Sequence, residues 1–277
     1  MPIVSVYTIK GGVGKTTMIE VLALGLLSAR KRVLVVDADL QADISYRLLG
    51  ETLSTFSVFS KTNYGIGAVT LGNLPPLPQK VVDELYLLPM EPDTIVKADE
   101  RIITNFEFLR DEDFIKKFDY ILIDTPPSYD FVVAENIMKT SDFIFTVVTP
   151  SIPVIKTVNM ELLRTLPAVM STLKRPAKLI GIIRNMVHTS RFVTTEQINL
   201  LMDNLEKVCQ QTKIPKYTPC FFTTAVPQRG NVFEYDRLRE IILSPQLRKK
   251  LYSIKTQLAI RQLTTEFLTR IQYLAEH

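Results

Sequence analysis

The chain has 277 residues, of which 46% are hydrophobic and 22% are charged, and its net charge is +4. This composition is typical of a globular protein and excludes disordered and collagen-like chains. Two cysteines outside any CxxC pair, together with only two histidines, argue against a disulfide scaffold, an iron–sulfur centre and a histidine metal centre.

Strand-like apolar runs alternate with helix-like segments along the chain. In chain order we expect a strand at 3–9, a helix at 16–28, strands at 32–36 and 85–88, a helix at 102–118, a strand at 120–123, a helix near 131–139, a strand at 143–148, a helix near 158–173, a strand at 179–183 and a helix near 194–211. Continuous apolar strands are typical of a parallel sheet with both faces covered. The pattern therefore predicts an α/β fold with a doubly wound, mostly parallel sheet, whose ligands bind beyond the carboxyl ends of the strands.

Two segments depart from this alternation. Residues 54–80 contain several glycines and a Pro-Pro pair, so we expect a surface excursion there. Residues 244–277 favour one helix or a helix pair with an apolar stripe formed by Ile260, Leu263, Phe267, Ile271 and Leu274. Without an internal repeat or a linker, we expect a single domain over 1–277 that ends in a basic helical segment, 228–277.

The sequence also gives expectations about location and charge. The sequence shows no signal peptide and no apolar run long enough to span a membrane, so we expect a cytoplasmic protein. Because the first strand begins at once, we expect no DNA-binding domain before it. The whole charge excess lies in 228–277, which indicates an anionic partner.

Residues 9–17 form the most informative motif, Ile-Lys-Gly-Gly-Val-Gly-Lys-Thr-Thr, between the first strand and the first helix. Glycines allow main-chain amides to converge on phosphate oxygens, and the positive end of the following helix adds to the attraction. Lys15 is expected to reach the β- and γ-phosphates, and Thr16 to offer its hydroxyl to Mg²⁺. The predicted phosphate-binding residues are Gly11, Gly12, Val13, Gly14, Lys15, Thr16 and Thr17.

The loop differs from the standard pattern, which would place a glycine at Ile9. It carries a second lysine instead, Lys10, and in this respect it resembles the deviant Walker A loop of the ParA/MinD family of ATPases. The resemblance implies that Lys10 crosses a dimer interface and contacts the phosphates of the partner's nucleotide. The alternative is a glycine-rich turn with incidental lysines.

Two apolar strands end in acids. Asp37 and Asp39 close the strand at 32–36, and Asp124 closes the strand at 120–123, followed by Thr-Pro-Pro as in the resembling family's Walker B strand. An acid at a buried strand end beside the loop is suited to hold Mg²⁺ and its water shell, which we expect of Asp124. The resemblance implies that Asp39 places the attacking water and contacts the metal shell. Asp37 is either part of this site or a structural carboxylate.

The same resemblance implies a base-binding side. Asn185 follows a later strand, where the family hydrogen-bonds adenine, and Pro227 matches a loop residue stacked near the ring. The alternatives are a strand-end cap and a simple turn proline. For DNA the candidates are Arg229, Arg248, Lys249, Lys250 and Lys255, and the alternative is a solvated helix face.

The implied function is an ATP hydrolase that uses ATP/ADP and Mg²⁺, forms a homodimer on ATP binding and segregates plasmid or chromosomal DNA. The ATP-bound dimer would bind nucleoid DNA non-specifically, and a centromere-binding partner protein would stimulate hydrolysis. The alternative is a MinD-like spatial regulator that positions protein cargo or division machinery without DNA. A membrane partner is not expected, because 264–277 is poor in basic residues. An iron–sulfur scaffold is disfavoured by the missing CxxC pair and by Lys10.

Overall fold

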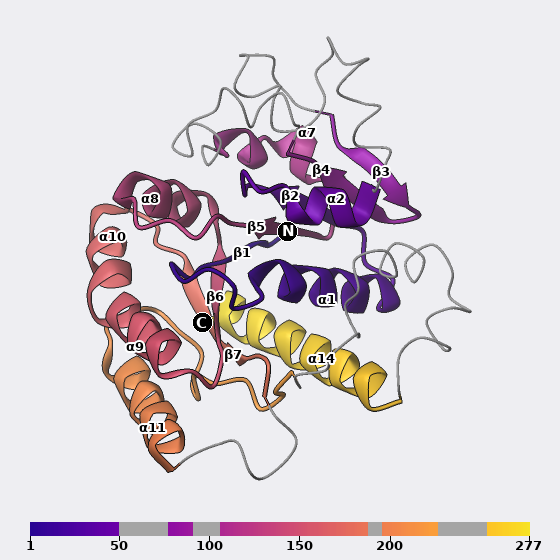
Figure 1. The fold of residues 1–277 in the computed structure, drawn as a ribbon. Coiled ribbons are helices and arrows are strands. Elements are labelled where there is room, and N and C mark those ends of the chain that lie inside the picture. Colours follow the sequence, from indigo (N-terminus) through magenta and orange to yellow (C-terminus); the bar gives the residue numbers. More distant parts are fainter. Residues whose placement is uncertain (50–76, 91–105, 188–195, 227–253) are drawn as a thin grey trace.

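A computed structural model describes residues 1–49, 77–90, 106–187, 196–226 and 254–277. Its centre is a seven-stranded sheet with the order β3-β4-β2-β5-β1-β6-β7 (Figure 1). All neighbouring strands are parallel except β3 and β4. The strands are β1 (Ile3–Val6), β2 (Val33–Asp37), β3 (Gln79–Val82), β4 (Leu85–Leu88), β5 (Tyr120–Asp124), β6 (Phe143–Val148) and β7 (Lys178–Arg184).

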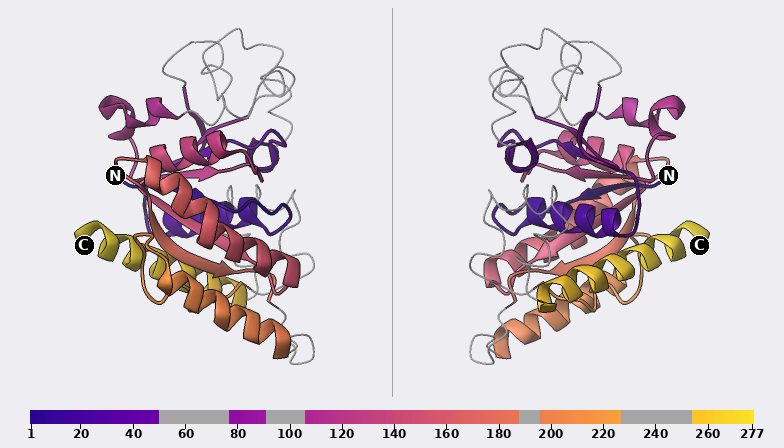
Figure 2. Two further views of the ribbon diagram at one scale, coloured as in Figure 1. Left: turned by 90° about the vertical axis from the view of Figure 1, so that its left-hand side faces the viewer. Right: turned by 90° about the vertical axis from the view of Figure 1, so that its right-hand side faces the viewer.

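Helices cover both faces of this sheet. Figure 2 shows α1 and α14 on one face and α8 to α11 on the other. The predicted doubly wound α/β fold is thus confirmed. The helices are α1 (Lys15–Ser28), α2 (Asp43–Leu49), α7 (Glu112–Ile115), α8 (Phe131–Thr140), α9 (Ile152–Met160), α10 (Leu166–Thr172), α11 (Glu196–Gln211) and α14 (Ile254–Glu276), with a five-residue π-turn, Glu161–Thr165, joining α9 to α10.

Alternation along β2 divides the core in two. Val33 and Val35 pack into a large cluster with the apolar side chains of α1 and α14, whereas Leu34 and Val36 pack with the aromatic residues around α7. Both sets of side chains are fully buried. This two-sided burial is the reason that the strands have continuous apolar sequences rather than alternating ones.

Helix α14 carries the predicted apolar stripe. Leu263, Phe267, Ile271 and Leu274 are buried in the main cluster, and Ile260 is half-buried against it. At Gly25 of α1, a Cβ atom would lie 1.8 Å from the Thr264 hydroxyl oxygen, so glycine is required for the close approach of the two helices. The stripe is therefore a packing face on the body of the protein.

One expectation about secondary structure is wrong, and a second differs from the structure only at its end. A helix over 102–118 does not form in its described part, because Asp111 has an extended backbone and its carboxylate caps α7 by accepting from the amides of Asp113 and Phe114. A 3₁₀ turn, Glu107–Arg110, precedes it. The end of the expected excursion at 54–80 forms β3, which a two-residue turn pairs with β4. Residues 50–76 lie outside the described part.

The other boundaries differ by less. The helix expected near 158–173 begins earlier, at α9, and runs through the π-turn into α10. In the described part of the chain, no helix is both long and apolar enough to cross a membrane.

Candidate functional site

The loop after β1 leads directly into α1 and leaves the first amides of that helix to a ligand. Gly14 is the N-cap residue, with a left-handed backbone (φ 92°), and has no side chain with which to cap the helix. A Cβ atom at Gly14 would also lie 2.2 Å from the Asn185 amide nitrogen. The first turn of this 14-residue helix contains no acidic residue. The partial positive charge at its amino-terminal end, which faces the loop, is therefore not offset by a side chain of that turn. This geometry fits a phosphate group.

The loop residues divide into exposed and buried ones. Lys10, Gly11 and Gly12 are exposed, whereas Val13 and Lys15 are buried. Burial lowers the pKa of Lys15, and the negative charges of Asp124, Asp39 and Glu161 oppose that effect. A buried ammonium group with acids on several sides is suited to exchange these contacts for phosphate oxygens.

Asp124 ends β5 next to the end of β2, since the register pairs it with Asp37. It is fully buried, and neither carboxylate oxygen has a hydrogen-bond partner of good geometry among the described residues. Burial raises its pKa to about 7, although the Thr16 hydroxyl and the Lys15 ammonium favour the charged form. A buried carboxylate beside a threonine hydroxyl is a set of oxygen ligands that fits Mg²⁺.

The two acids after β2 have different environments. Asp37 is fully buried, and its carboxylate accepts from the Ser45 amide (3.0 Å), the Ser45 hydroxyl (2.5 Å) and the Asp39 amide (3.1 Å). Burial and the charge of Asp124 raise the pKa of Asp37 well above its ordinary value. Asp39 is half-exposed and accepts from the Gln41 amide. Asp37 thus anchors the start of α2, and Asp39 is the acid that a ligand can reach.

A third acid, Glu161, lies behind the loop and was not expected from the sequence. Its carboxylate Oε1 accepts from the Ile9 amide (2.7 Å) and from the Thr8 hydroxyl (3.0 Å). Its position in the sequence carried a signal, because an acid here interrupts an apolar helix face that includes Val158 and Leu162.

On the base side, Asn185 follows β7 and its amide nitrogen donates to the Val13 carbonyl (2.8 Å). The segment before Pro227 runs alongside, because the Val226 amide donates to the Arg184 carbonyl and the Val187 amide to the Val226 carbonyl. The structure thus brings Asn185 to the phosphate loop at the carboxyl edge of the sheet, and Val226 lies on the segment that pairs with the residues around Asn185. Pro227 lies outside the described residues.

Helix α14 holds this base-side segment in place. The Glu266 carboxylate accepts from the amides of Thr223 and Thr224, and Arg270 is almost completely buried between the rings of Phe222 and Tyr217. Burial by itself raises the pKa of Glu266, but the hydrogen bonds from these two amides and the nearby Arg270 lower it below its ordinary value. The guanidinium donates to the carbonyls of Ile180, Pro219, Cys220 and Phe221.

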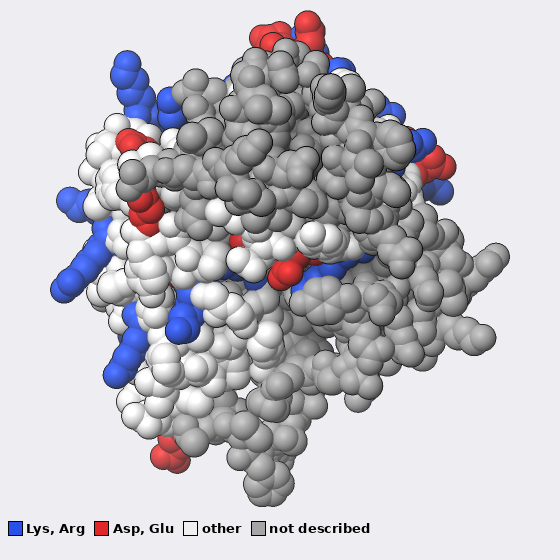
Figure 3. Space-filling model, turned by 45° about the horizontal axis from the view of Figure 1, so that its top comes forward, with Lys and Arg blue, Asp and Glu red and all other residues white. Residues whose placement is uncertain are grey.

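Most of the predicted DNA-contacting residues lie outside the part of the chain that the structure describes. Arg229, Arg248, Lys249 and Lys250 lie outside the described residues, and Lys255 lies in the first turn of α14, where the side chains are not described. On the face shown in Figure 3, basic side chains project along the left-hand edge, with acidic ones among them.

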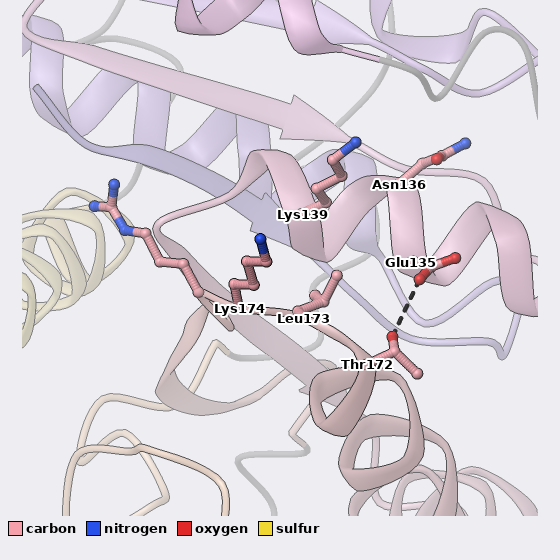
Figure 4. A pocket seen from close by; sticks show the side chains of 7 residues that line it. Glu135, Asn136, Lys139, Thr172, Leu173 and Lys174 are labelled. Atoms are coloured by element: carbon pink, nitrogen blue, oxygen red, sulfur yellow. Dashed lines mark hydrogen bonds between the residues drawn. The ribbon is translucent and has the colours of Figure 1, made fainter.

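A cavity of about 450 Å³ lies between α8 and the end of α10 (Figure 4). A hydrogen bond from the Thr172 hydroxyl to Glu135 crosses it. Both helices end here shortly before β6 and β7 begin, so the cavity lies at the amino-terminal edge of the sheet, away from the phosphate loop. Its lining residues are Glu135, Asn136, Lys139, Thr172, Leu173, Lys174 and Arg175.

Comparison with known proteins agrees with this geometry. A family described as "AAA domain" matches residues 1–179. The chromosome partitioning protein ParA of Caulobacter vibrioides is 28% identical over 199 residues, which are 68% of this chain and 70% of the relative. The chromosome-partitioning ATPase Soj of Thermus thermophilus is 30% identical over 194 residues, with the same coverage.

Among solved structures, pNOB8 ParA bound to nonspecific DNA has the same fold, with a TM-score of 0.71 and 18% identity over 98% of this chain and 99% of that one. The loop resembles deviant Walker A motifs, and the chain is also similar in sequence to the Soj ATPase and in fold to the pNOB8 ParA structure. The chain belongs to the matched AAA domain family and, within the P-loop ATPases, to the ParA/MinD family.

Proposed function

We propose that this protein is an ATP hydrolase that dimerises around two MgATP molecules and acts in DNA segregation. The observation that carries the proposal is the arrangement at the carboxyl edge of the sheet. An uncapped helix start, a buried lysine and the buried carboxylate of Asp124 converge there. Membership in a family of P-loop ATPases supports the choice of ATP as substrate.

Each of these groups has a role in phosphoryl transfer. The amides of residues 11–17 and the Lys15 ammonium bind the phosphates, and Thr16, Asp39 and Asp124 hold Mg²⁺. The metal ion neutralises charge on the phosphates when it is bound. Asp39, the half-exposed acid, orients the attacking water. Asn185 and Pro227 bind the adenine ring.

Lys10 is the group that makes the dimer functional. Its side chain is exposed, in contrast to that of Lys15, so it is free to extend toward a second subunit. The ammonium then contacts the phosphates bound by the partner and adds positive charge as negative charge develops on them. ATP binding and dimerisation are thereby coupled, and hydrolysis releases the dimer.

The DNA-binding part of the proposal rests on the positive charge of residues 228–277 and on the similarity of the fold to that of a DNA-bound ParA. We take residues 1–277 as one domain whose basic segment, 228–277, contacts DNA phosphates through Arg229, Arg248, Lys249, Lys250 and Lys255. A fold shared with a ParA bound to nonspecific DNA supports this assignment. The ATP-bound dimer is associated with the nucleoid in the cytoplasm, and a centromere-bound partner protein stimulates hydrolysis.

The test uses Asp39→Ala, which should bind ATP but not hydrolyse it and so accumulate as a dimer. With MgATP at low salt, this variant should retard a random DNA duplex in a gel, and retardation should weaken steeply with salt. Lys15→Ala is the control that should neither bind nucleotide nor shift DNA. Replacing Arg248, Lys249 and Lys250 together by alanine should weaken the shift while leaving the dimer intact.

Two results would contradict parts of the proposal separately. A dimer that forms with ATP but never retards DNA would exclude the segregation role and favour a MinD-like spatial regulator. An Asp39→Ala variant that hydrolyses ATP at the wild-type rate would exclude the assignment of the attacking water to Asp39.

A further inference from the structure

Glu161 is a buried acid in an unusual backbone position. It begins the π-turn Glu161–Thr165 in the middle of the α9–α10 helix, and only 1% of its surface is exposed. A π-turn inserts an extra residue into a helical turn, which shifts the direction in which the following side chains point. Leu162 and Leu166, on the same helix, are buried in the apolar core. An acid at such a site needs a specific partner to offset its burial.

The partners of Glu161 are at the entrance of the phosphate loop. One oxygen, Oε1, accepts both from the Ile9 main-chain amide at 2.7 Å and from the Thr8 hydroxyl at 3.0 Å. Thr8 and Ile9 are themselves buried, and β1 has already ended at Val6. The Ile9 amide is therefore beyond the strand, and the carboxylate fixes the course of the chain where it enters the loop.

Glu161 also affects Lys10 and Lys15, which come after Ile9 in the phosphate loop. Its charge is one of the three that favour the ammonium form of Lys15. Its second oxygen, Oε2, is buried without a hydrogen-bond partner among the described residues. Lys10 directly follows the amide that Glu161 holds, so the direction of the turn that presents Lys10 depends on this contact.

We propose that Glu161 is a positioning residue for the phosphate loop, which acts through the two hydrogen bonds that its Oε1 accepts from Ile9 and Thr8. The π-turn brings the carboxylate to the loop from a helix 152 positions away in the chain. This inference rests on the proposed nucleotide-binding role of the loop. Glu161 thus acts on the loop as a positioning residue, because its Oε1 is held by the Ile9 amide and the Thr8 hydroxyl.

The test compares Glu161→Ala, which removes the oxygen that accepts both hydrogen bonds, with Glu161→Gln, which retains an acceptor at the same reach. Affinity for MgATP is measured by calorimetry at a temperature where circular dichroism shows every variant fully folded. Glu161→Ala should weaken binding about tenfold or more, because a charge-assisted hydrogen bond to the loop is lost and the loop must be ordered on binding. Glu161→Gln should recover most of that loss.

Hydrogen exchange in the nucleotide-free protein gives a second readout. Peptides that cover residues 8–14 should exchange faster in Glu161→Ala than in the wild type, and Glu161→Gln should lie between them. Glu206→Gln is the matched control, because the Glu206 carboxylate likewise accepts hydrogen bonds from the main chain, from the amides of Cys220 and Phe221, but away from the loop. It should leave exchange of residues 8–14 and MgATP affinity unchanged.

The outcomes separate this inference from the proposed function. A folded Glu161→Ala protein with wild-type affinity and wild-type exchange of residues 8–14 would overturn the positioning role. If Glu161→Ala does not fold, Thr8→Val removes one of the two donors with little change of shape and should give a smaller effect in the same direction. Failure of the wild type to bind MgATP would refute the nucleotide site, while the exchange experiment would still decide the role of Glu161.

Discussion

The phosphate side and the base side of the candidate site are built in opposite ways. Among the described residues of the phosphate side, both oxygens of Asp124 and one of Glu161 are buried without a hydrogen-bond partner of good geometry. On the base side, the Arg270 guanidinium donates to four carbonyls and to Glu266, and Glu266 accepts from two amides. The first region leaves buried acidic oxygens for a ligand, whereas the second is a densely hydrogen-bonded frame in which the Arg270 Nε is left without a partner among the described residues. Substitutions in the two regions should therefore differ in what they change.

The largest effect should come from breaking the frame. Arg270→Ala leaves the carbonyls of Ile180, Pro219, Cys220 and Phe221 without this donor in a buried setting. We expect the free energy of unfolding to fall by about 3–5 kcal/mol, measured by urea denaturation. The control is Arg175→Ala, because the Arg175 side chain is 81% exposed although it pairs with Asp142. Its effect should be below about 1 kcal/mol. Equal losses in the two variants would contradict the contrast.

The next effect should appear in binding rather than in stability. Lys15→Met removes a charge whose burial lowers the pKa of the lysine, so the nucleotide-free protein should change in unfolding free energy by less than about 1 kcal/mol. Affinity for MgATP should fall at least 100-fold, about 2.7 kcal/mol, in calorimetry.

Lys10→Met is the matched control for that lysine. Because the Lys10 side chain is exposed, this variant should bind MgATP but fail to hydrolyse it or to dimerise. Full turnover by Lys10→Met would refute its role across the interface. A Lys15→Met protein that still binds MgATP would remove the phosphate site itself.

The smallest effect concerns pH. Burial raises the pKa of Glu161 to about 7, against the hydrogen bonds from Ile9 and Thr8 and the charge of Lys15. The folded protein therefore binds more protons at Glu161 than the unfolded chain does between about pH 4.5 and 7. This contribution to stability is fully present below that range and is lost as the pH rises through about 7.

Glu161→Gln should consequently flatten the dependence of unfolding free energy on pH in the nucleotide-free protein. The slope should decrease by up to about 1.4 kcal/mol per pH unit between pH 5 and 7. Burial raises the pKa values of Glu20 and Asp124 to about 7 as well, so part of the dependence should remain. Urea denaturation at a series of pH values measures it, and an unchanged slope would contradict the burial of a titrating Glu161.

The amino-acid sequence alone determined the phosphate loop, the parallel strands and the acids at their ends. Each of these is encoded in a short contiguous stretch, where local dihedral preferences and hydrophobic periodicity decide the conformation. The glycines of residues 11–14 and the apolar run before Asp124 are examples. For the same reason, the spacing of the apolar residues on α14 predicts its packing face without reference to the residues that it contacts.

Only the tertiary structure decided which distant groups meet. Asn185 and Val13 are 172 positions apart, and Glu161 and Ile9 are 152 apart, yet each pair is hydrogen-bonded. The break at Asp111 is a local cap, made with the amides of Asp113 and Phe114, whereas the antiparallel pairing of β3 depends on the neighbouring strand β4. Such contacts depend on how helices and loops pack around the sheet, and that packing reflects the free energy of the whole core rather than any local preference.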